Sequence, residues 1–438
     1  MGILRRLCSR NWLPKNDQKS LNTAPVAQRP IDLVIIGAGA AGLSLLLSLD
    51  EINYPHTVTL LERNAQPSND RIWSFWHIAC NSNSSKKNSS LPSYIESIIS
   101  HKWSNWTLST DLHSYSMNTS VYDYCSIRSE DLSALAHKRV NKNSNFNIIY
   151  NCDVTSIISS DEACLISTQH EQLVTSKIID TRPPSINNDH SGLLQCFYGE
   201  EIIVSADIFD PYSVKLMQQL KCSELGIEFL YILPFSTNHA LVEFTCFSPV
   251  FIKEDTLKSR LLDIINNLVK QHKYQIQRSE SAVLPMYMIN KNIHNTGHNS
   301  SSNGPNIIYG GIAGGAMRAS TGYSFLNSQQ WAKRCAKQLM HSDLLSKHAP
   351  INALYTKMDS IMLKVLRDDM NMGVTVFEQM FKRVKPDSFA RFMIQQATFL
   401  DFVSVIWAMP KWRFFKAACK LLFVAQKAAH RTTVEKGD

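Results

Sequence analysis

Near the start of this 438-residue chain, a glycine-rich turn lies between a predicted buried strand and a predicted apolar helix. The strand is the β-branched run IDLVII at residues 31–36, the turn is GAGAAG, and the helix continues as LSLLLSL. A second buried strand, VTLLER, follows at residues 58–63. Strand, turn, helix and strand occupy about thirty residues, the length of one βαβ unit. This combination restricts the segment to a parallel α/β domain of the Rossmann type.

The turn fits the pattern G-x-G-x-x-G with Gly37, Gly39 and Gly42. In that pattern the glycines allow a tight turn, close approach of a pyrophosphate, and packing of the helix on the sheet. Glu62 lies twenty residues after Gly42, where an acidic side chain accepts a hydrogen bond from a ribose hydroxyl. The alternative is a turn that joins strand to helix without a ligand. Because strand, helix and Glu62 are all in place, we predict a bound adenine dinucleotide.

A second glycine-rich segment, IYGGIAGGAMRASTGYSF at residues 308–325, is typical of a strand that runs into a loop and then a helix. Backbone N–H groups in such a loop, together with a helix N-terminus, bind anionic groups. FAD and NAD both use the first turn, so the first turn alone does not distinguish them. Two separated glycine loops favour FAD, and a plain strand-to-helix connection is the alternative.

The net charge of +8 is concentrated at the two ends of the chain. Residues 1–30 carry six bases and one acid, and residues 401–438 carry seven bases and three acids, which leaves the body at −1. A nucleic-acid-binding protein would instead carry a basic stripe across its fold. The distribution therefore argues against nucleic acid and favours a membrane surface.

No stretch reaches the roughly 18 uncharged apolar residues of a spanning helix, because glycines interrupt residues 33–49. The N-terminal residues lack the apolar core of a secretory signal. Ten cysteines include no C-x-x-C pair, and we interpret His294 and His298 as solvated loop residues. We therefore expect no metal site. The charge distribution, together with the lack of a predicted spanning helix or secretory signal, predicts a cytoplasmic protein that associates peripherally with the membrane.

Between two Ser/Asn-rich loops, the runs IEFLYILPFS and HALVEFTCFS predict a pair of antiparallel strands joined around residues 236–239. From about Asn327 the pattern becomes helical. We expect an α/β fold in which an FAD-binding βαβ domain carries an inserted, mainly antiparallel β substrate domain and a C-terminal helical segment. The expected boundaries are 1–30 for a basic arm, 31–80, 120–185 and 300–345 for the FAD-binding domain, 81–119 and 186–299 for the substrate domain, and 346–438 for the helical region.

Four segments carry a resemblance to a known family: DRIWSFW (70–76), QCFYGEEI (195–202), FLYILPFSTNHALVEFT (229–245) and GGAMRASTGYSF (314–325). With their spacing, they make the sequence similar to the bacterial-type lycopene beta-cyclases, flavoproteins that close the ends of linear carotenoids into rings. The resemblance covers most of residues 31–420. It implies acid-initiated, redox-neutral cyclisation of the ψ-ends of lycopene or a related linear carotene to β-rings.

The resemblance also implies the cofactors and the residues that serve them. The family is thought to use bound FAD in its reduced form, with NAD(P)H as reductant. Negative charge on a reduced flavin could stabilise a carbocation of the polyene. The cofactor-binding residues that it implies are Gly37, Gly39, Gly42, Glu62, Arg71, Gly314, Gly315, Thr321, Gly322 and Tyr323.

Glu243 is the acid that the resemblance implies, and Glu280, before a Pro-Met pair, is a second candidate. An acid that protonates a C=C bond must be protonated at neutral pH, which burial among apolar neighbours favours. The strand pattern by itself favours a Glu243 that points to solvent, and only the resemblance favours a buried acid. The sequence departs from the family at Phe244, where an acidic residue is usual, and at Ala319, where proline is frequent.

Two other functions remain open. An FAD-dependent monooxygenase or hydroxylase of an apolar substrate shares both glycine loops, but such enzymes typically carry Gly-Asp where this chain has Gly310, Gly311 and Ile312. A catalytically inactive carotenoid- or lipid-binding flavoprotein is the other, because of Phe244. The segment Phe399–Ala429 mixes aromatic and basic residues, which is typical of an interfacial anchor or of a helix packed on the body.

Overall fold

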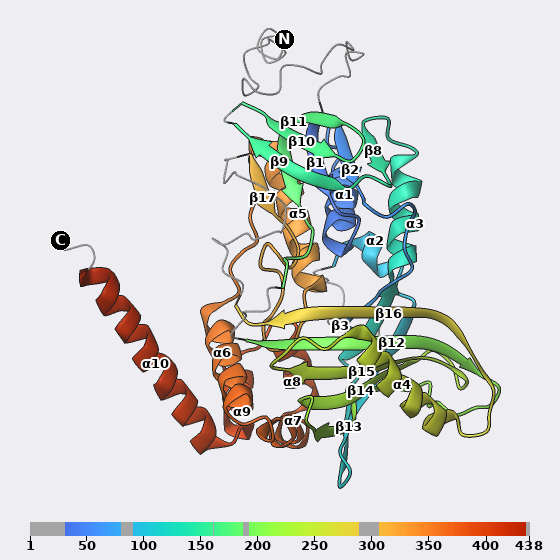
Figure 1. Ribbon diagram of the computed structural model, residues 1–438, viewed down its shortest axis with the longest axis vertical. Helices are drawn as coiled ribbons and strands as arrows, with labels where there is room; N and C mark the ends of the chain where they lie inside the picture. The colour runs from blue at the N-terminus through green and yellow to red at the C-terminus, as the bar shows by residue number, and fades with distance from the viewer. Residues whose placement is uncertain (1–30, 80–90, 161, 187–191, 289–305, 435–438) are drawn as a thin grey trace.

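The computed structural model describes residues 31–79, 91–160, 162–186, 192–288 and 306–434. The predicted basic arm at 1–30 and the loop histidines His294 and His298 lie outside the described residues. Figure 1 shows one large sheet at each end of the long axis, with the C-terminal helices beside the second sheet. The predicted mixed α/β fold class is confirmed.

The first sheet contains the βαβ unit that the glycine pattern predicts. β1 (Ile31–Ile36) pairs in parallel with β2 (Val58–Leu61) and with β11 (Gln172–Asp180). α1 (Ala40–Glu51) connects β1 to β2. The sheet is buried on both faces at β1, which explains the continuous apolar run there. In spatial order its strands are β8 (Phe146–Ile149), β2 (Val58–Leu61), β1 (Ile31–Ile36), β11 (Gln172–Asp180), β10 (Cys164–Thr168) and β9 (Val154–Ser159), and β17 (Ile307–Tyr309) also pairs with β11.

The second sheet is mainly antiparallel. β14 and β15 form the predicted hairpin, whereas β13 pairs in parallel with β5. Its strands are, in spatial order, β16 (Tyr274–Met286), β12 (Leu193–Val204), β15 (His239–Ser248), β14 (Ile227–Pro234), β13 (Ser213–Cys222), β5 (Asn105–Ser109) and β6 (Ser114–Asn118). A three-stranded sheet has the order β3 (Ile72–Ile78), β7 (Tyr122–Arg128) and β4 (His101–Trp103).

Helices cover these sheets and form the C-terminal part of the molecule. α5 packs on α1, α4 packs on β12 and β15, and the helices from α6 onward lie beside the second sheet (Figure 1). α10 packs on α6 and extends away from the body. The helices not yet given are α2 (Ser93–Glu96), α3 (Ser129–Val140), α4 (Glu254–Val269), α5 (Phe325–Ser342), α6 (Ala353–Asp368), α7 (Met372–Arg383), α8 (Pro386–Met393), α9 (Phe399–Ala408) and α10 (Lys411–Val434).

Candidate active site

The first glycine loop forms an open cradle at the N-terminus of α1. A Cβ atom at Gly42 would lie 2.0 Å from the carbonyl oxygen of Gly37, so this glycine is required for the turn itself. At Gly39 a Cβ atom would meet no atom of the described residues within 4 Å. Gly39 is the N-cap of α1, and neither a capping side chain nor an acid occupies the first turn. The free N–H groups and the helix dipole therefore face a space suited to a phosphate.

Glu62 follows β2 and is held beside this loop. Its Oε2 accepts a hydrogen bond from the Ala38 N–H at 2.7 Å, and its Oε1 accepts one from the Asn64 N–H at 2.9 Å. An acidic residue at this place, next to the first turn, is where a dinucleotide's ribose is recognised. Gly37, Gly39, Gly42 and Glu62 are thus brought together at one end of the first sheet.

The second glycine loop packs against the first. A Cβ atom at Gly311 would lie 3.1 Å from Cβ of Ala41, in the first turn of α1. Thr181, directly after β11, lies between the loops: its hydroxyl donates to the carbonyl of Ile36 at 2.7 Å, and it would be 2.9 Å from a Cβ at Gly37. Sequence reasoning missed Thr181, because only the sheet order reveals which strand end lies beside the turn.

The second loop continues to the boundary with the second sheet. Gly314 and Gly315 follow β17, and Gly322 has a φ of +72° and would place a Cβ atom 2.8 Å from Oε1 of Gln195. This oxygen is buried and has no hydrogen-bond partner among the described residues. A buried polar atom of this kind requires a partner, which an N–H group of a bound cofactor would supply. The two loops and Gln195 therefore fit FAD.

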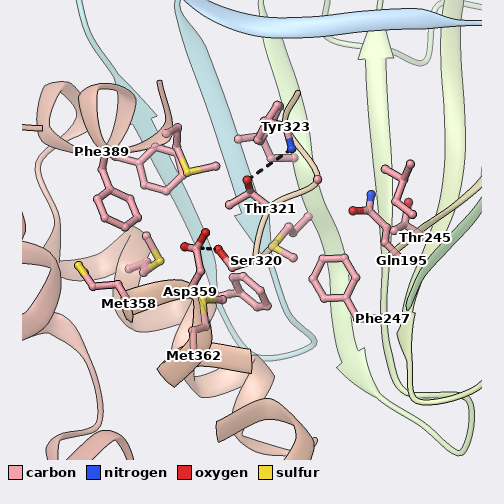
Figure 2. A pocket seen from close by; sticks show the side chains of 18 of the residues that line it. Gln195, Thr245, Phe247, Ser320, Thr321, Tyr323, Met358, Asp359, Met362 and Phe389 are labelled. Atoms are coloured by element: carbon pink, nitrogen blue, oxygen red, sulfur yellow. Dashed lines mark hydrogen bonds between the residues drawn. The ribbon is translucent and has the colours of Figure 1, made fainter. Parts of the chain in front are cut away.

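A cavity of about 760 Å³ begins at this boundary and is lined mainly by apolar side chains. Figure 2 shows Gln195, Thr245 and Phe247 on one side of it and Met358, Met362 and Phe389 on the other, with the Ser320–Tyr323 segment between. The predicted residues Thr321, Gly322 and Tyr323 line it, as do Arg71, Glu243 and Glu280. Helices α6 to α10 supply most of one wall.

The two candidate acids lie in the second sheet and face this cavity. Glu243 on β15 is 6 % exposed and Glu280 on β16 is 5 % exposed, and both line the cavity. The alternative in which Glu243 points to solvent is therefore wrong. The reason is that α6 to α10 cover this face of the sheet, which the alternation of one strand does not indicate.

Burial raises the pKa of Glu243 to about 8, and the negative charge of Glu280 contributes to the same shift. The Thr245 hydroxyl donates to Oε1 of Glu243 and opposes the shift, as do the charges of Arg71 and Arg278. Burial dominates because a carboxylate in an apolar cavity loses its hydration. Burial of Glu243 therefore favours the protonated form of its carboxyl.

Glu280 is held by cationic and backbone donors. Arg278 donates to its Oε2 at 2.6 Å, and the N–H of Ile72 donates to the same oxygen at 3.1 Å. Burial raises the pKa of Glu280, and the charge and hydrogen bond of Arg278 oppose that shift. Arg71, predicted as a cofactor residue, lies close enough to lower the pKa of both acids and also lines the cavity.

A further carboxylate extends this network away from the cavity. Glu201 accepts hydrogen bonds from Arg278 at 2.7 Å, from Arg128 at 2.6 Å and from His239 at 2.7 Å. Burial alone would raise the pKa of Glu201, but Arg128 and Arg278 lower it to about 2. Arg278 is therefore fixed between two acids, which holds its guanidinium against Glu280.

Aromatic groups surround the acids. The Tyr124 hydroxyl is hydrogen-bonded to those of Tyr231 and Tyr323, each at 2.9 Å. Burial raises the pKa of all three hydroxyls well above the usual value, so they are neutral. The ring of Trp76 lies 4.6 Å from that of Tyr124 and 5.3 Å from that of Tyr323. Such rings stabilise positive charge through their π faces.

Residues 32–419 of the chain match the family described as "Lycopene cyclase protein". The chain belongs to the lycopene cyclase family. A lycopene beta-cyclase of Pseudescherichia vulneris is 23 % identical to this family member over 301 residues, which are 67 % of this chain and 70 % of the relative. The family assignment made from the four sequence segments is thus confirmed.

Solved structures similar to this cyclase family member show its fold. A geranylgeranyl bacteriochlorophyll reductase-like protein from Thermoplasma acidophilum has a TM-score of 0.53 at 12 % identity, with 89 % of this chain and 98 % of that chain covered. A flavoprotein/dehydrogenase from Cytophaga hutchinsonii has a TM-score of 0.53 at 12 % identity, with 83 % and 92 % covered. These likenesses show that the chain shares the overall fold of these two proteins.

The departures from the cyclase family pattern lie outside the acid pair. Phe244 follows Glu243 in β15 and therefore points to the opposite face, where it is buried in the apolar cluster beneath α4. Ala319 is buried in the core. Neither side chain lines the cavity among the described residues. The Phe244 side chain therefore lies on the face of β15 opposite to the Glu243 carboxyl.

Sequence reasoning also missed a buried ion pair in this cyclase family member. Arg318 donates to Asp359 at 2.6 Å. The Ser320 hydroxyl donates to the same carboxylate at 2.7 Å, as Figure 2 shows. The guanidinium also lies over the rings of Tyr355 and Phe392, at 4.9 and 4.7 Å. This cluster joins the second glycine loop to α6 and α8. No local pattern connects residues so far apart in the chain.

Among the described residues, no group of three His, Cys, Asp or Glu side chains is arranged to hold a metal ion.

Proposed function

We propose that this chain is a carotenoid cyclase that converts the ψ-ends of lycopene, or of a related linear carotene, to β-rings without net oxidation. The observation that carries the proposal is Glu243, a buried carboxyl that faces a mainly apolar cavity, where burial raises its pKa and favours its protonated form. A polyene offers no polar group for recognition, so a cavity lined mainly by apolar side chains suits it. Membership of the lycopene cyclase family supports the same conclusion.

The chemistry follows from the cavity. The Glu243 carboxyl transfers its proton to the terminal C=C bond and leaves a tertiary carbocation. A neighbouring double bond attacks this carbon, one C–C bond closes the ring, and a different proton then leaves the carbon skeleton. The rings of Trp76, Tyr124 and Tyr323 stabilise the cation, and the apolar walls exclude water that would quench it.

We propose that FAD is held by the two glycine loops and is active in its reduced form, with NAD(P)H as the reductant. Bound and reduced, FAD would supply negative charge close to the developing cation. Three observations support this assignment: the open space at Gly39, the placement of Glu62, and the Oε1 atom of Gln195, which has no hydrogen-bond partner in the described part of the chain.

The test of the proposed function is expression in a cell that accumulates lycopene, followed by pigment analysis. Conversion of linear to ringed pigment is the expected result. Unchanged lycopene with a flavin-loaded protein would favour the inactive binding protein. Oxygenated pigment would favour a monooxygenase.

The purified enzyme is expected to form rings only when its flavin is reduced. Dithionite-reduced and oxidised samples should be compared anaerobically on a linear carotene in detergent or liposomes, with product analysis by absorbance and chromatography. The reason is that only the reduced flavin adds negative charge beside the cation. Equal activity of both samples would contradict the role proposed for the reduced cofactor.

We further propose that α9 and α10 lie on an anionic membrane surface and that the carotene enters the cavity there. Exposed aromatic and aliphatic side chains gather on these two helices: Phe399, Leu400, Val403, Ile406, Trp407, Trp412, Phe415, Leu422 and Phe423. Lys411, Arg413, Lys416 and Lys420 lie among them. Aromatic groups flanked by bases are the composition of an interfacial helix.

The cavity opens within this exposed surface. Ile406 and Phe415 are 53 % and 62 % exposed, yet both also line the cavity. A carotene that leaves a bilayer at this surface would therefore remain in contact with apolar groups throughout. The position of α9 is fixed, because Thr398 and Asp401 form a capping box and Arg391 pairs with Asp401 at 2.8 Å. In the described part of the chain, no helix has the length and apolar character needed to cross a bilayer.

Lys416→Ala is expected to weaken binding to anionic liposomes about fivefold, because one base near such a surface contributes about 1 kcal/mol. Trp412→Ser should weaken binding to anionic and neutral liposomes alike, because it removes an apolar contact. Flotation at low and high salt measures both effects, and salt should weaken binding by screening.

Leu112→Ser is the matched control, since Leu112 is 86 % exposed but lies between β5 and β6, outside α9 and α10. Truncation after Met409 would be a poorer test, because Phe414 and Phe415 form part of the cavity wall. Binding that Lys416→Ala and Trp412→Ser leave unchanged would place the membrane contact on another surface.

A further inference from the structure

The two acids of the cavity lie on β15 and β16, the two strands that flank β12. Gly199 on β12 pairs with Glu243 on β15 and with Glu280 on β16. Residues that pair directly on neighbouring strands point to the same face of a sheet, so the three form one row on the cavity face. Strands lie about 4.8 Å apart, so the Cα atoms of the two acids are roughly 10 Å apart, with only Gly199 between them.

Gly199 leaves a space that the Glu243 side chain uses. A Cβ atom at this position would lie 3.2 Å from Cβ and 3.4 Å from Cγ of Glu243. The Glu243 side chain therefore leans over Gly199, along the row that leads to Glu280. Glycine in the interior of a strand weakens it and marks a close approach. Here the acid side chain approaches, together with Cδ1 of Leu241, which would lie 3.3 Å from the same Cβ atom.

The hydrogen bonds of the two acids differ. Glu280 accepts from the Arg278 guanidinium and from the Ile72 N–H, whereas in the described part of the chain Glu243 accepts only from the Thr245 hydroxyl. Donors that include a guanidinium stabilise a carboxylate. When the pair holds one proton, that proton therefore resides on Glu243 and the negative charge on Glu280.

We propose that Gly199 is a positioning residue that joins Glu243 and Glu280 into one pair through which a single proton cycles. The inference rests on the proposed cyclase function. In each ring closure Glu243 gives its proton to the terminal C=C bond, one C–C bond forms, and the cation loses one proton to the pair. That proton returns to Glu243 over Gly199. One proton leaves the pair and one comes back, so no proton from solvent is required.

Other charged or titratable groups face Glu243 from several elements. They are Arg71 before β3, Arg278 on β16, Tyr231 on β14 and Tyr323 in the second glycine loop. A substitution at Gly199 changes none of these groups. A shift in the pKa of Glu243 in such a variant therefore reports a change in the distance between the Glu243 and Glu280 side chains.

The test is a double-mutant cycle of Gly199→Ala and Glu280→Gln. Glu280→Gln removes a charge that raises the pKa of Glu243, so the alkaline limb of the pH–activity profile should move to lower pH by about one unit. Gly199→Ala should move the limb in the same direction, because its methyl group displaces Glu243 from Glu280 by a few tenths of an ångström. The double variant should move no further than Glu280→Gln alone.

Infrared titration of the protonated carboxyl band of Glu243, identified by its loss in Glu243→Gln, gives the same pKa without any need for activity. Tyr198→Phe is the control. Tyr198 directly precedes Gly199 and points to the opposite face of β12, toward α4, so this substitution should leave the pKa of Glu243 unchanged. The proposal would be overturned if Gly199→Ala left the pKa of Glu243 unchanged. It would also be overturned if the pKa shift of the double variant equalled the sum of the two single shifts. A wild-type enzyme without ring formation would refute the cyclase function instead, and the infrared titration would still decide whether the acids are coupled through Gly199.

Discussion

Glu243→Gln is expected to keep the fold and the flavin and to lower the rate of ring formation by about 10²- to 10⁴-fold, the usual contribution of a general acid. Glutamine has almost the same shape, and the Thr245 hydroxyl can donate to its carbonyl oxygen as it does to Glu243. The amide carries no proton acidic enough for transfer to carbon. Pigment chromatography measures the rate, and flavin absorbance reports that the site is intact.

Glu200→Gln is the matched control for this substitution. Glu200 is 5 % exposed and burial also raises its pKa, but it pairs with Val242 and does not line the cavity. Its loss should leave turnover unchanged. A single turnover by wild-type enzyme equilibrated in D₂O should place one deuterium in each ring. Near-normal turnover of Glu243→Gln would transfer the acid role to Glu280.

The pH dependence follows from the pKa of Glu243, which burial raises to about 8. Activity should be high below this value and fall as the pH rises through it, because the carboxylate has no proton to donate. Stability should change in the same direction. The folded protein binds this proton more tightly than the unfolded chain, so the free energy of unfolding decreases as the pH rises from the unfolded pKa toward 8.

The parts of the site that the sequence predicted are those with a local pattern. The first glycine loop, α1 and Glu62 lie within one βαβ unit, so their spacing along the chain already indicates their arrangement. The second glycine loop was found in the same way. Glu243 and Glu280 came only from the resemblance to the lycopene cyclases, because an acid in an alternating strand usually points to solvent.

The other parts depend on contacts between distant segments. Arg318 and Asp359 meet only after α6 packs beside the second glycine loop. Thr181 is placed by the order of strands in the first sheet. Gly199 did carry a signal, since a glycine inside an otherwise apolar strand indicates a close approach. Which group approaches it could be known only from the pairing of β12 with two neighbours.

Gly39→Val is expected to yield a folded protein without FAD. The backbone at Gly39 has a φ of −79°, which any residue adopts, and in the part of the chain that the structure describes no atom lies within 4 Å of a Cβ atom there. The valine side chain would instead fill the space in which the pyrophosphate approaches the N-terminus of α1. Flavin absorbance after purification measures the loss, and circular dichroism reports the fold. Added FAD should raise the melting temperature of wild-type apoprotein but not that of the variant.

Gly42→Ala provides the contrast that makes this result specific. Its Cβ atom would lie 2.0 Å from the carbonyl oxygen of Gly37, so the turn itself must move and the protein should lose stability together with its flavin. Gly39→Val tests the space that the described residues leave open beside the turn, and Gly42→Ala tests the space that the Gly37 carbonyl already occupies. A yellow, flavin-loaded Gly39→Val protein would show that the pyrophosphate binds elsewhere, and the assignment of the first loop as the FAD cradle would then be wrong.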